Sequence, residues 1–130
     1  MFLKPEISAM LIDTMFELKS LQVAENTIEA TLGILPDNAI YKAHFPGRPI
    51  TPGVCIMQIV QEVLEKAIDN KLLLEKAKNV KFLSLLTPDE TQQVCLTINY
   101  DPATMTANAV MKDNETVIAK MMLNYSLIVQ

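Results

Sequence analysis

The 130-residue chain has no tryptophan, only one histidine, two cysteines and three glycines. Its aromatic side chains are limited to four phenylalanines and three tyrosines, which form no evident platform for stacking nucleic-acid bases. Acidic residues outnumber basic ones by 15 to 11, and the net charge of −4 argues against a nucleic-acid partner, which requires clustered positive charge. Because Cys55 and Cys95 lack the spacing of metal ligands, we expect neither a metal site nor a cofactor.

Long apolar runs are also missing. No uninterrupted stretch approaches the ~18 apolar residues of a membrane helix, so we expect no membrane association. Met1 is not followed by a basic region and then an apolar stretch, so we expect no cleaved signal peptide. The two cysteines fit small buried side chains in a reducing cytoplasm, and we therefore expect a cytoplasmic protein.

The length fits a single domain over residues 1–130 with a core of ordinary size. Half of the residues are hydrophobic, and the mean hydropathy of +0.22 is high for a small monomer. Such apolar surface is best buried against another subunit, which predicts a homodimer or a higher homo-oligomer.

Hydrophobic periodicity predicts one long helix among several strands. The helix begins at Gly53 and extends to about Asn70, with a broad apolar face and a polar stripe of Gln58, Glu62, Glu65 and Asp69. Two strands are expected within residues 16–34, with their turn near Asn26, and further strands at residues 80–86, 93–100, 105–112 and 116–129. This order predicts an α+β fold in which an antiparallel sheet of five to six strands wraps around one central helix.

The segment directly before the predicted helix combines the single histidine, His44, with three prolines and two glycines over residues 44–54. The prolines fix a rigid loop, and the glycines allow close approach of another group. An imidazole on such a loop, beside a helix N-terminus, is arranged as in an active site. The alternative is an ordinary loop histidine packed beside prolines.

The pattern His-Phe-Pro-Gly-x-Pro-x-x-Pro-Gly-Val over residues 44–54 resembles the signature of the 3-hydroxyacyl-(acyl-carrier-protein) dehydratases, hotdog-fold enzymes of fatty acid synthesis and related polyene pathways. Residues 80–89 resemble the strand and turn of the same family, although the usual Pro-Gly-Asp turn reads Pro88-Asp89-Glu90 here. The resemblance covers roughly residues 15–130, and the histidine-arginine-aromatic-proline segment that commonly opens the family is absent from residues 1–21.

Dehydration of a 3-hydroxyacyl thioester needs a base for the C2 proton, an acid for the departing C3 hydroxyl and donors for the enolate oxygen. The resemblance implies that His44 is the base and that the amide of Gly53, with that of Val54, is the oxyanion donor. It implies a thioester of acyl carrier protein or CoA as substrate. An acidic carrier would need a local basic patch, for which Lys42 and Arg48 are candidates, with Lys76, Lys78 and Lys81 further along; the alternative for the last three is that they are solvated surface lysines. The remaining expected substrate-binding residues are Phe45, Pro52 and Met57.

The acid is where the sequence departs from the family. Fourteen residues after the histidine, where family members carry a carboxylate that reaches the site across the dimer interface, the chain has Gln58, which has no proton to deliver at neutral pH. Glu62, one helical turn further, is a candidate replacement, and its alternative interpretation is simply a residue of the helix's polar edge, together with Glu65 and Asp69. Ala43 also replaces a usual glycine.

Three functions remain open at this point. The first is a thioester dehydratase that uses His44, Gly53 and either Gln58 or Glu62. The second is a non-catalytic or half-site subunit that pairs with a complete dehydratase, contributing His44 to a site whose acid comes from the partner. The third and least favoured is a hotdog thioesterase, because this loop has no carboxylate to activate water.

Overall fold

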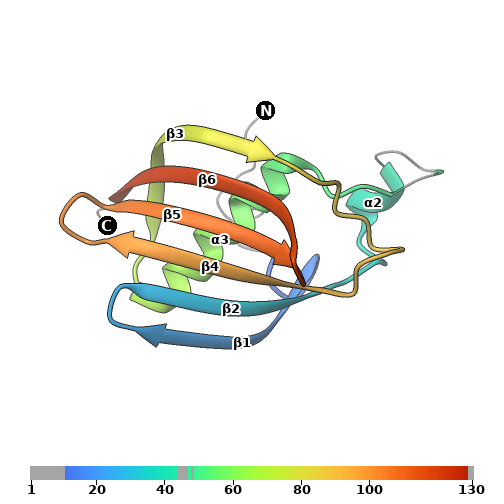
Figure 1. The fold of residues 1–130 in the computed structure, drawn as a ribbon, viewed down its shortest axis with the longest axis horizontal. Helices are drawn as coiled ribbons and strands as arrows, with labels where there is room; N and C mark the ends of the chain where they lie inside the picture. The colour runs from blue at the N-terminus through green and yellow to red at the C-terminus, as the bar shows by residue number, and fades with distance from the viewer. Residues whose placement is uncertain (1–10, 44–46, 48, 129–130) are drawn as a thin grey trace.

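The computed structural model describes residues 11–43, 47 and 49–128. Six antiparallel strands form one sheet in the order β1-β2-β4-β5-β6-β3, and the sheet curves over the long helix α3 (Gly53–Ile68) (Figure 1). The predicted α+β arrangement, a sheet around one helix, is therefore confirmed. The strands are β1 (Phe16–Ala24), β2 (Thr27–Ile34), β3 (Leu72–Phe82), β4 (Gln93–Asp101), β5 (Thr106–Asp113) and β6 (Thr116–Leu127).

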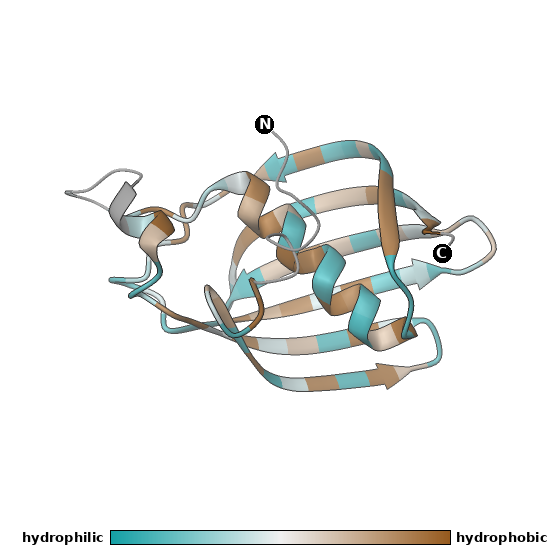
Figure 2. Cartoon of the chain, turned by 180° about the vertical axis from the view of Figure 1, so that it is seen from behind, coloured by the Kyte–Doolittle hydropathy of each residue, from teal (hydrophilic) through white to brown (hydrophobic). Residues whose placement is uncertain are grey.

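Helix α3 packs its apolar face against the sheet. Figure 2 shows the helix from behind, with its hydrophilic segments turned away from the strands. It ends where Asp69 adopts the left-handed conformation (φ 55°) and donates its N–H to the Glu65 carbonyl, close to the predicted end. In the part of the chain that the structure describes, no helix has both the length and the apolar character to cross a membrane. The buried residues of α3 are Cys55, Ile56, Ile59, Val60, Glu62, Val63 and Leu64.

Tight turns fix the register of the hairpins. The turn between β1 and β2 places Glu25 at a positive φ of 54° and Asn26 beside it, as predicted for this position. Along β4, side chains alternate between the core and the outer face, and this alternation places Cys95 on the exposed face. The expectation that both cysteines are buried is thus wrong for Cys95 and confirmed for Cys55.

The third strand differs from its prediction. A strand was expected at residues 80–86, but β3 begins at Leu72 and ends at Phe82. It lies at the edge of the sheet and pairs with β6 alone, and nearly all of its side chains after Leu72 are exposed and show no period-two pattern. Pairing with the long strand β6, rather than local preference, makes this segment extended.

Candidate active site

The first turn of α3 begins without a side-chain cap. Pro52 occupies the N-cap position in an extended conformation and offers no side-chain hydrogen bond. Its carbonyl accepts from the N–H groups of Cys55 and Ile56, at 3.0 and 3.2 Å. Among the described residues, the N–H groups of Gly53 and Val54 have no hydrogen-bond acceptor. Two unpaired amides at the positive end of the helix dipole therefore form a place for a negatively charged oxygen.

Gly53 packs tightly against an aromatic ring. A Cβ atom added at Gly53 would lie 2.7 Å from Cζ and 2.8 Å from Cε2 of Phe82, at the end of β3. Real Cβ atoms do not approach other atoms so closely, so any other residue here would displace the ring. This contact explains the glycine and brings β3 beside the helix start.

Four exposed apolar side chains come from the first turn of α3 and from the end of β3 with the residues that follow it, and we call them the apolar rim: Val54, Phe82, Leu83 and Leu85, which are 68%, 48%, 55% and 59% exposed. Solvent-facing apolar groups gathered beside a functional site usually mark a surface that another molecule covers. Met57, a predicted substrate-binding residue on the same helix, is half-buried and packs against the core.

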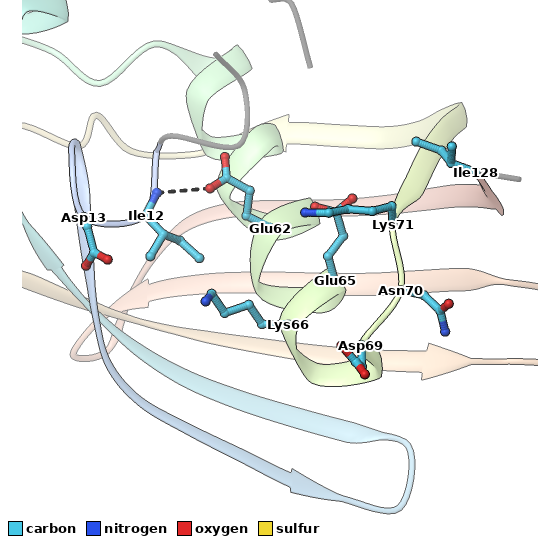
Figure 3. Close-up of a pocket in the computed structure, with 9 residues that line it drawn as sticks. All are labelled: Ile12, Asp13, Glu62, Glu65, Lys66, Asp69, Asn70, Lys71 and Ile128. Carbon is cyan, nitrogen blue, oxygen red and sulfur yellow. Dashed lines mark hydrogen bonds between the residues drawn. The ribbon is translucent and has the colours of Figure 1, made fainter. Parts of the chain in front are cut away.

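Gln58 and Glu62 form a pair on α3. Gln58 Nε2 donates to Oε2 of Glu62 at 3.2 Å. Figure 3 shows the second contact of this carboxylate, in which Oε1 of Glu62 accepts from the N–H of Ile12 at 3.0 Å. Glu62 is only 4% exposed, so this member of the polar stripe is buried, although its neighbours on the stripe line the same polar cavity. Burial raises the pKa of Glu62, and the hydrogen bonds from the Ile12 amide and from Gln58 oppose that rise.

A cavity of about 640 Å³ lies along the second half of α3, away from the helix start. It is wide and polar, and Glu62 and Ile12 form part of its wall (Figure 3). Neither Gly53 nor Gln58 lines it, so this cavity and the unpaired amides are different places in the molecule. Its lining residues are Ile12, Asp13, Glu62, Glu65, Lys66, Asp69, Asn70, Lys71 and Ile128.

Not every predicted site residue is described. His44, Phe45 and Arg48 lie outside the described residues, as does the side chain of Lys42. Within residues 11–43, 47 and 49–128, no three histidine, cysteine, aspartate or glutamate side chains gather as metal ligands would. The lysines of β3 at positions 76, 78 and 81 are exposed on the edge strand.

Sequence reasoning missed one buried polar contact near the site. Tyr41, in the short helix α2 (Ala39–Ala43), and Thr51 share a hydrogen bond of 2.8 Å between their hydroxyl oxygens. Their side chains are 2% and 4% exposed. The two residues flank the segment that carries His44, but nothing in their spacing marked them as partners.

Comparisons with known proteins agree with the fold and the motif. The sequence model of the ApeI-like family (ApeI dehydratase) matches residues 20–121, so the chain belongs to the ApeI-like dehydratase family. The 3-hydroxyacyl-(acyl-carrier-protein) dehydratase FabZ of Wolbachia pipientis wMel is 36% identical over 84 residues, which are 54% of this chain and 59% of that protein. The match thus spans about three fifths of the length of this relative.

Solved structures match over more of the chain. A chain of the dehydratase heterocomplex ApeI:P from Xenorhabdus doucetiae superposes with a TM-score of 0.75 at 19% identity, covering 85% of this chain and 96% of that one. A protein from Erwinia carotovora subsp. atroseptica gives a TM-score of 0.68 at 17% identity, covering 89% and 98%. At such low sequence identity, these superpositions establish the fold alone. They confirm the predicted hotdog fold.

Proposed function

We propose that the chain is a subunit of a dehydratase acting on 3-hydroxyacyl thioesters of acyl carrier protein or CoA, in the cytoplasm. The observation that carries this proposal is the uncapped start of α3, where the amides of Gly53 and Val54 have no acceptor among the described residues. These donors suit a thioester oxygen that gains negative charge as the C2 proton leaves. Membership of the ApeI-like dehydratase family supports the reaction class.

In this proposal His44 removes the C2 proton, because an imidazole titrates near neutrality and the residue is placed nine positions before Gly53 in the family-like motif. The electrons of the broken C–H bond move toward the thioester oxygen, which the helix amides stabilise. Loss of the C3 hydroxyl as water then completes the double bond and requires a proton donor.

Gln58 stands where that donor is expected, and Glu62 does not replace it in our proposal. The carboxylate of Glu62 is buried and holds the Ile12 amide with one oxygen and Gln58 with the other. We infer that Glu62 orients the side chain of Gln58 instead of protonating the substrate. A chain working alone would then lack the acid, which is typically worth ~10²–10⁴-fold in rate.

A second candidate, a half-site subunit that pairs with a complete dehydratase, is favoured by the geometry of α3. The N–H groups of Gly53 and Val54 point along the helix axis out of its start, whereas the Gln58 side chain projects sideways from the second turn, so the acid position and the oxyanion site of one chain point in different directions. The apolar rim supports a covering subunit. The similar structure from Xenorhabdus doucetiae is itself a dehydratase heterocomplex.

Purified chain should be assayed for hydration of a 2-enoyl thioester, alone and after co-expression with a complete dehydratase. The decisive partner is a variant of that dehydratase lacking its own histidine but keeping its acid. Turnover that appears only in the mixture, and that is lost with His44→Ala in this chain, is the expected result. Absence of turnover in every combination, with a stable complex formed, would refute a catalytic contribution of His44.

A further inference from the structure

The outer strand β3 leaves one backbone edge of the sheet open. It pairs with β6 on one side, and none of the described strands lies on its other side (Figure 1). An edge of 11 residues presents unpaired N–H and C=O groups to which another strand can bind. We propose that this edge binds a strand of a different subunit whose outward side chains are carboxylates, in preference to a second copy of this chain. The inference goes beyond the proposed function, because it concerns assembly and requires no turnover.

The register with β6 assigns the side chains of β3 to the two faces of the sheet. Residues directly opposite one another in neighbouring strands point to the same face. Ala119, Leu123 and Tyr125 of β6 are buried, so their partners in β3 point inward, to the side of the sheet that carries α3. These inward residues are exposed although they are apolar: Leu74, Ala77 and Phe82.

The same register places three lysines of β3, Lys76, Lys78 and Lys81, on the opposite, outer face of the sheet. Two register shifts interrupt β3, and at the second of them, between Lys78 and Lys81, Asn79 adopts a positive φ of 52°. Strict alternation would turn Lys81 inward, and the extra residue of the bulge keeps it outward. The β6 partners of the three lysines alternate with the buried residues of that strand: Asn124, Met122 and Lys120.

These outward lysines have no carboxylate partner in the part of the chain that the structure describes. Lys81 lies directly opposite Lys120, an arrangement in which like charges repel. No ion pair or hydrogen bond to any of these lysines occurs among the described residues. Glu75, the single acidic residue of β3, instead accepts from Ser126 Oγ at 2.7 Å. The outer face of this edge is therefore basic, on a chain whose net charge is −4.

Apolar exposure distinguishes β3 from an edge that is merely protected. Lysines and bulges can keep an edge strand from pairing. Here, however, the inward Leu74 and Phe82 stay exposed, and the apolar rim continues from the end of the strand, as at a surface that another molecule covers. The other edge strand, β1, differs because its inward Leu18 and Leu21 pack against the core. The edge that needs a covering subunit is therefore β3.

Charge then decides which strand fits this edge best. In an antiparallel pair of two β3 strands, the two-fold axis brings the outward lysines of one copy opposite or diagonal to those of the other. Carboxylates at the same positions would form cross-strand ion pairs with the lysines. Each exchange is modest at an exposed site and is screened by salt, but three together should favour the carboxylate strand by ~10- to 100-fold in Kd at low salt.

A charge-reversed copy of this chain serves as a partner that differs only at the edge. It carries Lys76→Glu, Lys78→Glu and Lys81→Glu. We expect wild type and this copy to bind each other ~10- to 100-fold more tightly than either binds itself, and the difference to shrink as salt is added. Sedimentation of fluorescently labelled wild-type chain, alone and with unlabelled copy, measures both constants.

The matched control copy undergoes the same change in net charge at exposed lysines of β1, α3 and β5, and it should bind the wild type no more tightly than the wild type binds itself. Its substitutions are Lys19→Glu, Lys66→Glu and Lys112→Glu. Hydrogen exchange then locates the contact. Amides of β3 should exchange more slowly in the mixture with the charge-reversed copy, whereas those of the other edge strand, β1, should not change.

The inference is overturned if the mixture is no tighter than the wild type alone, which would make a second copy an equally good occupant or the edge a protected one. Equal tightening by the control copy, or association without slower exchange in β3, would overturn it as well. Should the charge-reversed copy fail to fold, judged by circular dichroism, glutamine at the same three positions removes the repulsion alone. That variant should bind itself more tightly than the wild type does, and unchanged self-association would contradict the role of the lysines.

Discussion

Gln58→Glu should convert this chain into a self-sufficient dehydratase. The new carboxyl would take the place of the Gln58 amide, whose Nε2 is 3.2 Å from Oε2 of Glu62. Two carboxylates at this distance repel by about 5 kcal/mol at an effective dielectric constant near 20. The pair therefore keeps one proton through neutral pH, because two like charges so close cannot both ionise. The substitution thus introduces a proton donor, and the existing Glu62 beside it keeps the new carboxyl protonated.

We expect the rate of dehydration of a 3-hydroxyacyl thioester by the variant to exceed that of the wild-type chain alone by ~10²–10⁴-fold, the usual worth of a positioned acid. The rate should fall at high pH as the carboxyl pair loses its proton, and at low pH as His44 becomes protonated. Adding His44→Ala to the variant should abolish the gain.

Gln61→Glu provides a matched control. Gln61 also donates to a glutamate four residues later, with Nε2 3.5 Å from Oε2 of Glu65, but it lies almost one turn further from Gly53 and also donates to the Leu72 carbonyl at 3.0 Å. This variant should gain no activity although it also creates a carboxyl pair. The reasoning fails if Gln58→Glu folds like the wild type, measured by circular dichroism and thermal unfolding, and shows no gain, or if Gln61→Glu gains equally.

Three further predictions concern the helix start, the buried carboxylate and the apolar rim. Gly53→Ala should lower activity because its Cβ meets the Phe82 ring at 2.7 Å, and Phe82→Ala in the same chain should restore part of the loss, as steady-state kinetics would show. Because the pKa of Glu62 is raised in the folded state, its contribution to the free energy of unfolding is present below its ordinary value of 4.5 and is lost as pH rises through the raised value. Glu62→Gln should therefore flatten the dependence of stability on pH in urea unfolding, and an unchanged slope would contradict the raised pKa. Leu85→Glu should shift the protein toward monomers in analytical ultracentrifugation, whereas an unchanged assembly would show that the rim is not an interface.

The sequence alone determined the features that depend on neighbouring residues. The spacing of apolar residues predicted α3, and the turn near Asn26 was expected where Glu25 adopts a positive φ. The motif of residues 44–54 predicted the family, which the family match confirms. These signals are local, because helix periodicity, turn chemistry and a contiguous motif are all contained in a few adjacent positions.

Only the tertiary structure decided the features that join distant segments. The hydrogen bond from the Ile12 N–H to Glu62 joins residues 50 positions apart. Glu62, which the sequence placed on the polar stripe, is buried at this contact. The ring of Phe82 explains the glycine at position 53, and pairing with β6 made a strand from the segment beginning at Leu72. Burial and pairing of this kind depend on which surfaces meet when the sheet closes over the helix. The residue types and spacing within one segment do not reveal those contacts.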